Sequence, residues 1–306
     1  MEEYLKRILR HLPIQFADEE ANEFVEYLSE AYLENLEKEK YQFAFTAFHM
    51  LNMIFVYKTK WFLKGQHNQA IEDSLHNYIQ QNRGTTFNTV FDLSLLPEKR
   101  SLEALLQSLN FHANDIGICK NHVDVRNNCS HASGRIYYKT KERVGHYIEE
   151  EIEFVEKIQN KLKTELKKYT QKFLDENWQQ SFLSRDFKDL FEENYFSVKD
   201  LELISQATLP LFRKKSNNEK NVRQKILYLL LIYEIQNQIN NGENLFLEKL
   251  PILMIDLPEK IKIEKNGNED EIYTSEIIEE FIMSIISDFS NEERVRAEEI
   301  LGLVAE

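Results

Sequence analysis

The residues with the greatest capacity for chemistry lie in one stretch of the chain, from Lys120 to His146. It carries six Lys or Arg and two acidic residues, so its local charge is +4 in a chain whose formal net charge is −14. Four of the eight histidines lie in or beside this stretch, namely His112, His122, His131 and His146. A positive patch on an acidic chain indicates a site for an anionic ligand such as RNA.

The segment from Val123 to Ala132 predicts an amphipathic helix in the middle of this stretch. Val125, Cys129 and Ala132 fall within a narrow arc at about 100° per residue and can face a core. Arg126 and His131 lie about 140° apart around the axis, and Asn127 lies between them on the polar side. Polar groups concentrated on a helix that is otherwise anchored by apolar residues indicate a partner or a ligand.

The sequence Arg126-Asn127 followed by His131 resembles the R-x4-6-H motif of the HEPN family (higher eukaryotes and prokaryotes nucleotide-binding domains). A polar residue directly after the arginine is usual in that family, and Asn127 fits. The resemblance covers roughly residues 20 to 165. It implies an α-helical bundle with the motif on a late helix. Ser133 stands where toxins regulated by nucleotidyl modification carry a tyrosine, so that form of regulation is not expected.

The resemblance also implies a mechanism, because HEPN ribonucleases cleave RNA without a metal. Two protomers pair through their motif helices, and the RNA 2′-hydroxyl attacks the adjacent phosphate to leave a 2′,3′-cyclic phosphate. On this basis His131 acts as general acid or base, a task that suits an imidazole with a pKa near neutrality. Arg126 stabilises the charge on the phosphorane, and Asn127 orients His131 or the phosphate.

Four basic residues near the motif are the expected contacts to the RNA backbone, namely Arg135, Lys139, Lys141 and Arg143. The resemblance therefore implies a homodimeric endoribonuclease acting on RNA, with tRNA as one candidate substrate. Many family members are toxins or antiphage effectors, so a trigger or partner from a phage or a defence complex is expected. The same basic segment is also consistent with a solvated loop that binds no RNA.

Two alternatives for the motif stay open. The bundle could be a non-catalytic interaction or regulatory subunit of a defence or toxin–antitoxin complex, with Arg126 and His131 as interface or structural residues. Zinc could instead be held by Cys119, His122, Cys129 and His131, a donor set that zinc accepts. Cys129 and His131, however, lie about 200° apart on an unbroken helix and cannot both face one ion. We therefore expect no metal and no cofactor.

The elements that position these residues are predicted to be helices. Only 8 Gly and 5 Pro occur in 306 residues, which favours long helices over a sandwich, a barrel or a solenoid of short repeats. We expect Asp18 or a residue beside it to cap one helix and Gly65 to end the next. Two β-prone runs around Asn266-Gly267 predict a hairpin. Apolar spacing predicts helices over residues 19–38, 40–62, 68–81, 101–109, 115–132, 147–183, 221–240, 275–288 and 291–305.

The expected fold is all-α. Residues 1–185 should form a HEPN-like helical bundle with a long trailing helix, and residues 186–306 a smaller helical domain with one β-hairpin near 260–274. His49 is expected to be a core histidine, and the acid run from Glu149 to Glu151 a solvated helix face. Two cysteines, no signal peptide and no apolar run that could span a bilayer predict a cytoplasmic protein without membrane contact.

Overall fold

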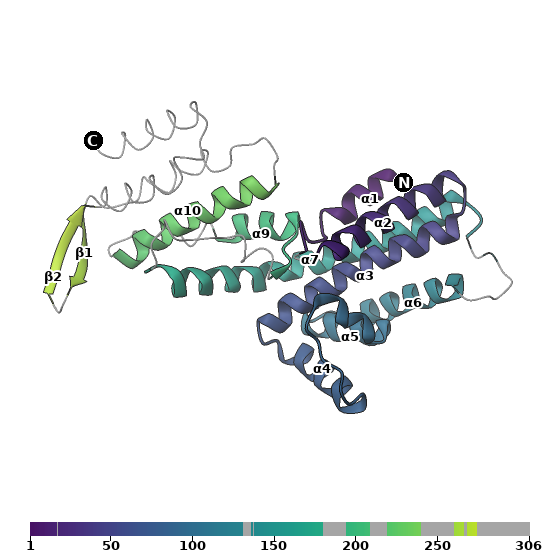
Figure 1. The fold of residues 1–306 in the computed structure, drawn as a ribbon, viewed down its shortest axis with the longest axis horizontal. Coiled ribbons are helices and arrows are strands. Elements are labelled where there is room, and N and C mark those ends of the chain that lie inside the picture. Colours follow the sequence, from purple (N-terminus) through teal and green to yellow (C-terminus); the bar gives the residue numbers. More distant parts are fainter. Residues whose placement is uncertain are drawn as a thin grey trace, which may run out of the picture. The chain divides into compact units, whose positions relative to one another are not determined.

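The computed structural model describes residues 1–16, 18–130, 136, 138–179, 194–208, 219–239, 260–265 and 268–273. In this part of the chain the fold is all-α with one β-hairpin, as predicted (Figure 1). The helices are α1 (Glu2–Leu9), α2 (Glu19–Glu37), α3 (Tyr41–Gly65), α4 (Gln69–Gln81), η1 (Val90–Leu95, a 3₁₀ helix), α5 (Glu98–Ser108), α6 (Ala113–Ser130), α7 (Lys141–Asn177), α9 (Val198–Thr208) and α10 (Glu219–Ile239). None of these helices is both long and apolar enough to cross a membrane.

The chain divides into two compact units. The first comprises Met1–Lys163 with Leu190–Asp200, and the second comprises Thr164–Asp189 with Leu201–Glu306. Helix α7 belongs to both, because its last turns lie in the second unit. The domain boundary expected at residue 185 lies outside the described residues.

Helix α3 is the centre of the first unit. Its aromatic side chains Phe45, Phe48 and Phe55 are fully buried, because α2, α5, α6 and η1 all pack against it. Even charged side chains of its second half are enclosed, with Lys58 and Lys60 at most 2% exposed. A helix that is apolar on nearly every side is stable only when neighbours cover it on nearly every side.

The predicted start of α2 is confirmed, and α3 continues three residues beyond the predicted residue 62 before it ends at Gly65. An oxygen of the Asp18 side chain accepts a hydrogen bond from the backbone N–H of Glu20 at 3.1 Å, which satisfies one of the unpaired donors at the start of α2. Helix α3 ends at Gly65. Two residues later His67 takes a φ of 55°, which turns the chain toward α4.

A buried polar cluster ties residues 194–200 to the helices of the first unit. The Asp200 carboxylate is ion-paired with Lys58, and its Oδ1 accepts a hydrogen bond from Gln159 Nε2 at 2.6 Å. Ser197 donates its backbone N–H to Asp200 Oδ2 at 2.9 Å and lies 3.2 Å from Lys58 Nζ. Gln159 in turn hydrogen-bonds His11 at 3.3 Å. The cluster therefore joins residues that are distant in sequence but belong to the same unit.

The second unit contains the last turns of α7, the helices α9 and α10, and the hairpin. The side chains of Gln224 and Lys220 on α10 both contact Asp175 on α7, each at 2.8 Å. Tyr228 donates its hydroxyl to the carbonyl of Ser205 on α9 at 2.7 Å.

Strands β1 (Lys260–Lys265) and β2 (Asn268–Tyr273) pair antiparallel, with Lys260 opposite Tyr273. The predicted hairpin is thereby confirmed. Its turn at Asn266-Gly267 and the helices predicted over 275–288 and 291–305 lie outside the described residues.

Candidate functional site

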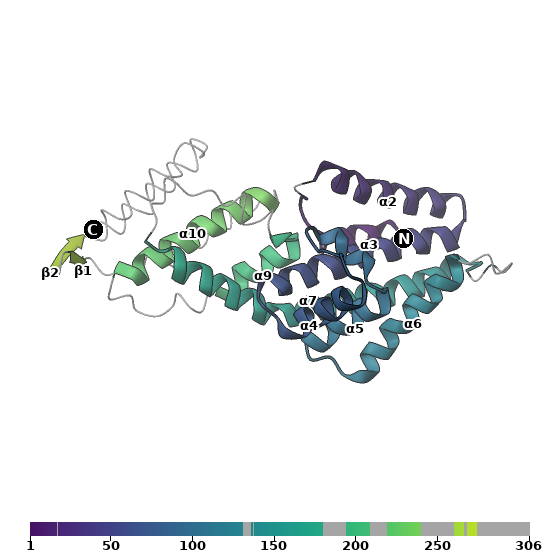
Figure 2. The same ribbon diagram turned by 60° about the horizontal axis from the view of Figure 1, so that its bottom comes forward.

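The motif segment is anchored on both sides at the start of α3. Gln42 Nε2 donates a hydrogen bond to the carbonyl oxygen of Cys129 at 2.6 Å, which holds the last turn of α6. After the motif, the buried ring of Tyr138 packs against Phe45 at 5.0 Å and Tyr147 at 5.3 Å between centroids. Figure 2 shows the end of α6 and the first turns of α7 at the same end of the first unit.

The structure places Arg126 and Asn127 next to each other near the end of α6, both half-buried. The predicted catalytic residue His131 and the predicted RNA contact Arg135 lie outside the described residues. The helix predicted to reach residue 132 is described as far as Ser130. Of the three motif residues, the structure therefore describes Arg126 and Asn127.

Arg126 belongs to a chain of charged side chains that the sequence did not reveal. Its guanidinium is ion-paired with the carboxylate of Glu98, in the first turn of α5. The other carboxylate oxygen of Glu98 lies 3.7 Å from His49 Nε2 on α3. The opposite ring nitrogen, His49 Nδ1, lies 2.5 Å from a carboxylate oxygen of Glu151 on α7. These four residues, called the Arg126–Glu151 relay below, connect α3, α5, α6 and α7.

The electrostatics of the relay favour a protonated His49. The imidazole is 1% exposed, and burial alone would lower its pKa. The charge and hydrogen bond of Glu151, helped by Glu98, outweigh that cost and raise the pKa of His49 to about 9. Burial likewise acts to raise the pKa of Glu98, but the neighbouring charges of His49 and Arg126 hold that pKa below its usual value.

Two predictions are settled by the relay. His49 is a core histidine, as expected, and its Nδ1 is hydrogen-bonded to Glu151. The prediction that Glu149 to Glu151 form a solvated face is wrong for Glu151, which is 1% exposed and faces His49. The three acids point in different directions because successive residues turn about 100° around a helix. Glu149 pairs with Arg7 at 2.8 Å, and Glu150 lies 3.3 Å from His122.

Other charged side chains of α6 also face carboxylates or lysines on neighbouring helices. Lys120 Nζ lies 2.8 Å from a carboxylate oxygen of Glu103 on α5, and Asp124 Oδ1 lies 2.5 Å from Lys99 Nζ. Lys120 therefore contributes little to a positive patch, although the sequence counts it in the basic stretch. Ion pairs of this kind fix the rotation of α6 about its axis more than they add stability.

The exposed positive charge lies at the start of α7. Lys139, Lys141 and Arg143 are all exposed, and the Arg143 guanidinium lies 5.9 Å from the centre of the Tyr138 ring. The helix begins at Lys141, earlier than the predicted residue 147. The basic segment is therefore partly helical rather than a loop. These three cations lie within five positions of the chain, beside the end of α6. In the described part of the site, they are the feature that most favours binding of an anionic ligand.

The described residues offer no support for a metal. They contain no group of three His, Cys, Asp or Glu that could hold a metal ion. Cys119 and Cys129 are buried thiols, and burial raises the pKa of Cys129 to about 11 and that of Cys119 further. A thiol with a raised pKa is a poor source of the thiolate that zinc needs. The fourth ligand of the zinc alternative, His131, lies outside the described residues.

Comparisons with protein-family models, with curated proteins and with solved structures find no match for this chain. The HEPN resemblance therefore depends on the motif residues and their helical setting alone.

Proposed function

We propose that the chain is a metal-independent endoribonuclease that cleaves RNA to 2′,3′-cyclic phosphate ends in a site built from two copies. The observation that carries the proposal is the arrangement at the end of α6. Arg126 and Asn127 are held in the last turns of this helix, five and four residues before His131, and the exposed cations Lys139 and Lys141 lie at the start of α7.

The proposed chemistry needs one proton acceptor, one proton donor and one cation. His131 takes the proton of the attacking 2′-hydroxyl or returns a proton to the 5′-oxygen that leaves, with the second copy supplying the complementary group. Arg126 neutralises the extra negative charge on the phosphorane. The 2′-oxygen forms its bond to phosphorus as the bond to the 5′-oxygen breaks, so no water or metal enters this step.

The Arg126–Glu151 relay supports this role because it preorganises the guanidinium. Arg126 is connected through Glu98 to a buried, protonated His49. The Arg126 guanidinium is therefore already held in place before RNA binds. A guanidinium has five N–H donors, and pairing with Glu98 is compatible with donation to a phosphate. A fixed donor aimed at developing charge contributes more to catalysis than a mobile one.

Within this proposal the protein is a cytoplasmic toxin or antiphage effector whose substrate is RNA, with tRNA as one candidate. The acidic remainder of the chain would repel RNA. An RNA strand would then bind only at the site formed by two copies, where the cations at the start of α7 attract it.

The second candidate function is a non-catalytic interaction subunit of a defence or toxin–antitoxin complex. One observation favours it, namely the ion pair between Arg126 and Glu98. This pair gives Arg126 a structural role that requires no RNA. In that case the end of α6 would be a protein interface, and the relay would hold its shape.

The variants Arg126→Lys and Arg126→Ala separate the two functions. A lysine can still pair with Glu98. Its ammonium group cannot donate two parallel hydrogen bonds to a phosphate, as the planar guanidinium of arginine does. The nuclease proposal predicts that Arg126→Lys folds like the wild type and loses RNA cleavage. The interaction proposal predicts no cleavage by any form, and weaker assembly for Arg126→Ala.

Mixing subunits tests whether the site is shared between copies. His131→Ala protein is added to wild-type protein at a constant total concentration. A composite site predicts that activity falls more steeply than the fraction of wild-type subunits, because mixed pairs are impaired. A decline in proportion to that fraction would show that each copy acts alone.

A further inference from the structure

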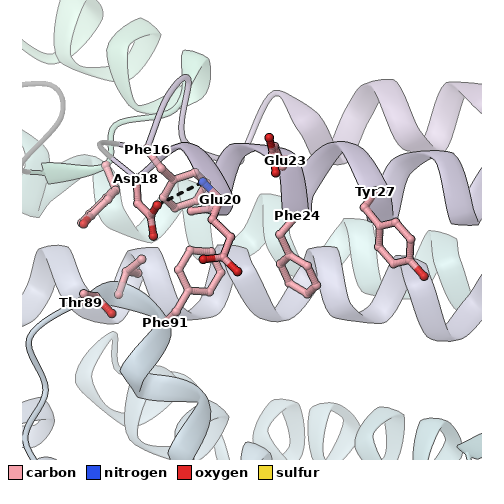
Figure 3. Close-up of a pocket in the computed structure, with 11 residues that line it drawn as sticks. Phe16, Asp18, Glu20, Glu23, Phe24, Tyr27, Thr89 and Phe91 are labelled. Carbon is pink, nitrogen blue, oxygen red and sulfur yellow. Dashed lines mark hydrogen bonds between the residues drawn. The ribbon is translucent and has the colours of Figure 1, made fainter.

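The first unit carries a second site, lined by aromatic rings and unrelated to the motif. It is a cavity of about 610 Å³, a size typical of small-ligand sites. Figure 3 shows it between the start of α2 and η1. Five of the described residues that line it are aromatic, namely Phe16, Phe24, Tyr27, Phe91 and Tyr195.

Four of the rings, those of Phe16, Phe24, Phe91 and Tyr195, form a connected group rather than isolated exposed side chains. The Phe91 centroid lies 5.2 Å from that of Phe16 and 6.2 Å from that of Phe24, and Phe16 lies 5.5 Å from Tyr195. Phe16 is buried, whereas Tyr27 is 66% exposed. The cavity therefore has an apolar floor that is fixed by packing and an aromatic wall that faces solvent.

The charge around the cavity has one sign. Asp18, Glu20 and Glu23 line it, and none of the described lining residues is Lys, Arg or His. Glu20 lies on the same face of α2 as Phe24 and Tyr27, because residues four and seven apart share a face (Figure 3). The nearby cation Lys64 is engaged elsewhere, since its Nζ lies 4.0 Å from the centre of the Trp61 ring and donates to the Phe87 carbonyl at 3.2 Å.

We infer that this cavity binds a small organic cation, an ammonium or guanidinium group carried on an apolar or aromatic body. The aromatic faces attract a cation through their quadrupoles, and the Glu20 carboxylate supplies a counter-charge at the rim. A phosphate-bearing ligand such as a nucleotide is disfavoured, because the described lining residues include three acids and no cation. The site is independent of the proposed ribonuclease activity.

Calorimetric titration of the full chain tests the inference with three probes. These are phenyltrimethylammonium, its neutral isostere tert-butylbenzene, and the anion benzenesulfonate. The cation should bind about tenfold more tightly than the neutral isostere, and the anion should not bind. Equal affinity for the cation and the isostere, or no binding of the cation at millimolar concentration, would overturn the inference.

Variants on α2 locate the binding. Glu20→Gln and Tyr27→Leu should each weaken binding of phenyltrimethylammonium about threefold to tenfold. Glu26→Gln is the matched control, because Glu26 is exposed on the same helix and does not line the cavity. Glu20 and Tyr27 are exposed, so their replacement should leave the unfolding midpoint unchanged. Binding that survives both substitutions would place the cation elsewhere and refute the site.

Discussion

The protonated state of His49 has a measurable consequence for stability. Its pKa is about 9 in the folded protein and about 6.5 when exposed. Between these values the folded state holds a proton that the unfolded state has released, so the free energy of unfolding falls by about 1.4 kcal/mol per pH unit. The stabilisation is complete below pH 6.5 and is lost by pH 9. Over about 2.5 units the loss is roughly 3 kcal/mol.

Urea unfolding of the wild type and of His49→Gln between pH 6 and pH 9.5 measures this contribution. The quantity to follow is the difference in unfolding free energy between the two proteins at each pH. Lys60 contributes the opposite slope, because burial lowers its pKa to about 7, but it is present in both proteins and cancels in the difference. A wild-type advantage that shrinks by roughly 3 kcal/mol across this range is expected. A difference that does not change with pH would show that His49 is neutral in the folded state.

Three further predictions follow from other contacts. Asp200→Asn leaves the buried Lys58 ammonium without its carboxylate, and should cost about 3 to 5 kcal/mol in urea unfolding, whereas the double variant Lys58→Met/Asp200→Leu should lose less. Tyr32→Phe removes a part-buried hydrogen bond to the Met1 carbonyl (2.9 Å) and should cost about 1 kcal/mol in urea unfolding. In an inactive His131→Ala background, Lys141→Gln should weaken RNA binding and reduce the slope of log affinity against log salt by about 1. An unchanged slope would show that Lys141 does not contact RNA.

Helices with a regular apolar spacing and a recognisable end could be predicted from the sequence. Residues Glu19 to Glu37 form a helix with Asp18 as its cap, and the next helix ends at Gly65. The hairpin was predictable because two β-prone runs flank an Asn-Gly pair. In each case the signal is local, so no tertiary contact is needed to interpret it.

Helices whose stability comes from tertiary contacts were missed or shortened. Helix α1 is only eight residues long and depends on burying Leu5 and Ile8. The first turns of α7 contain one apolar residue that becomes fully buried, Val144, and a glycine that is tolerated inside the helix. Gly145 packs near Tyr4 of α1, an element that the sequence pattern did not predict.

The relay illustrates what sequence patterns cannot provide. Glu151 belongs to a run of three identical acids, and only the helix rotation relative to α3 decides which of them faces His49. Glu98 follows Pro97 at the start of α5, where an acid is expected as a favourable partner of the helix dipole. Nothing local shows that it also bridges His49 and Arg126. The partner of Arg126 was therefore beyond prediction, although Arg126 itself was singled out.

The central claim is that His131 and Arg126 cleave RNA without a metal, and one experiment tests it most directly. Purified wild-type protein and its His131→Ala variant are incubated with total RNA and with tRNA in the presence of EDTA, and the new ends are mapped. We expect cleavage by the wild type alone, leaving 2′,3′-cyclic phosphate. Cleavage that persists in His131→Ala, that occurs only in a parallel reaction without EDTA, or that leaves a 3′-hydroxyl would contradict this expectation.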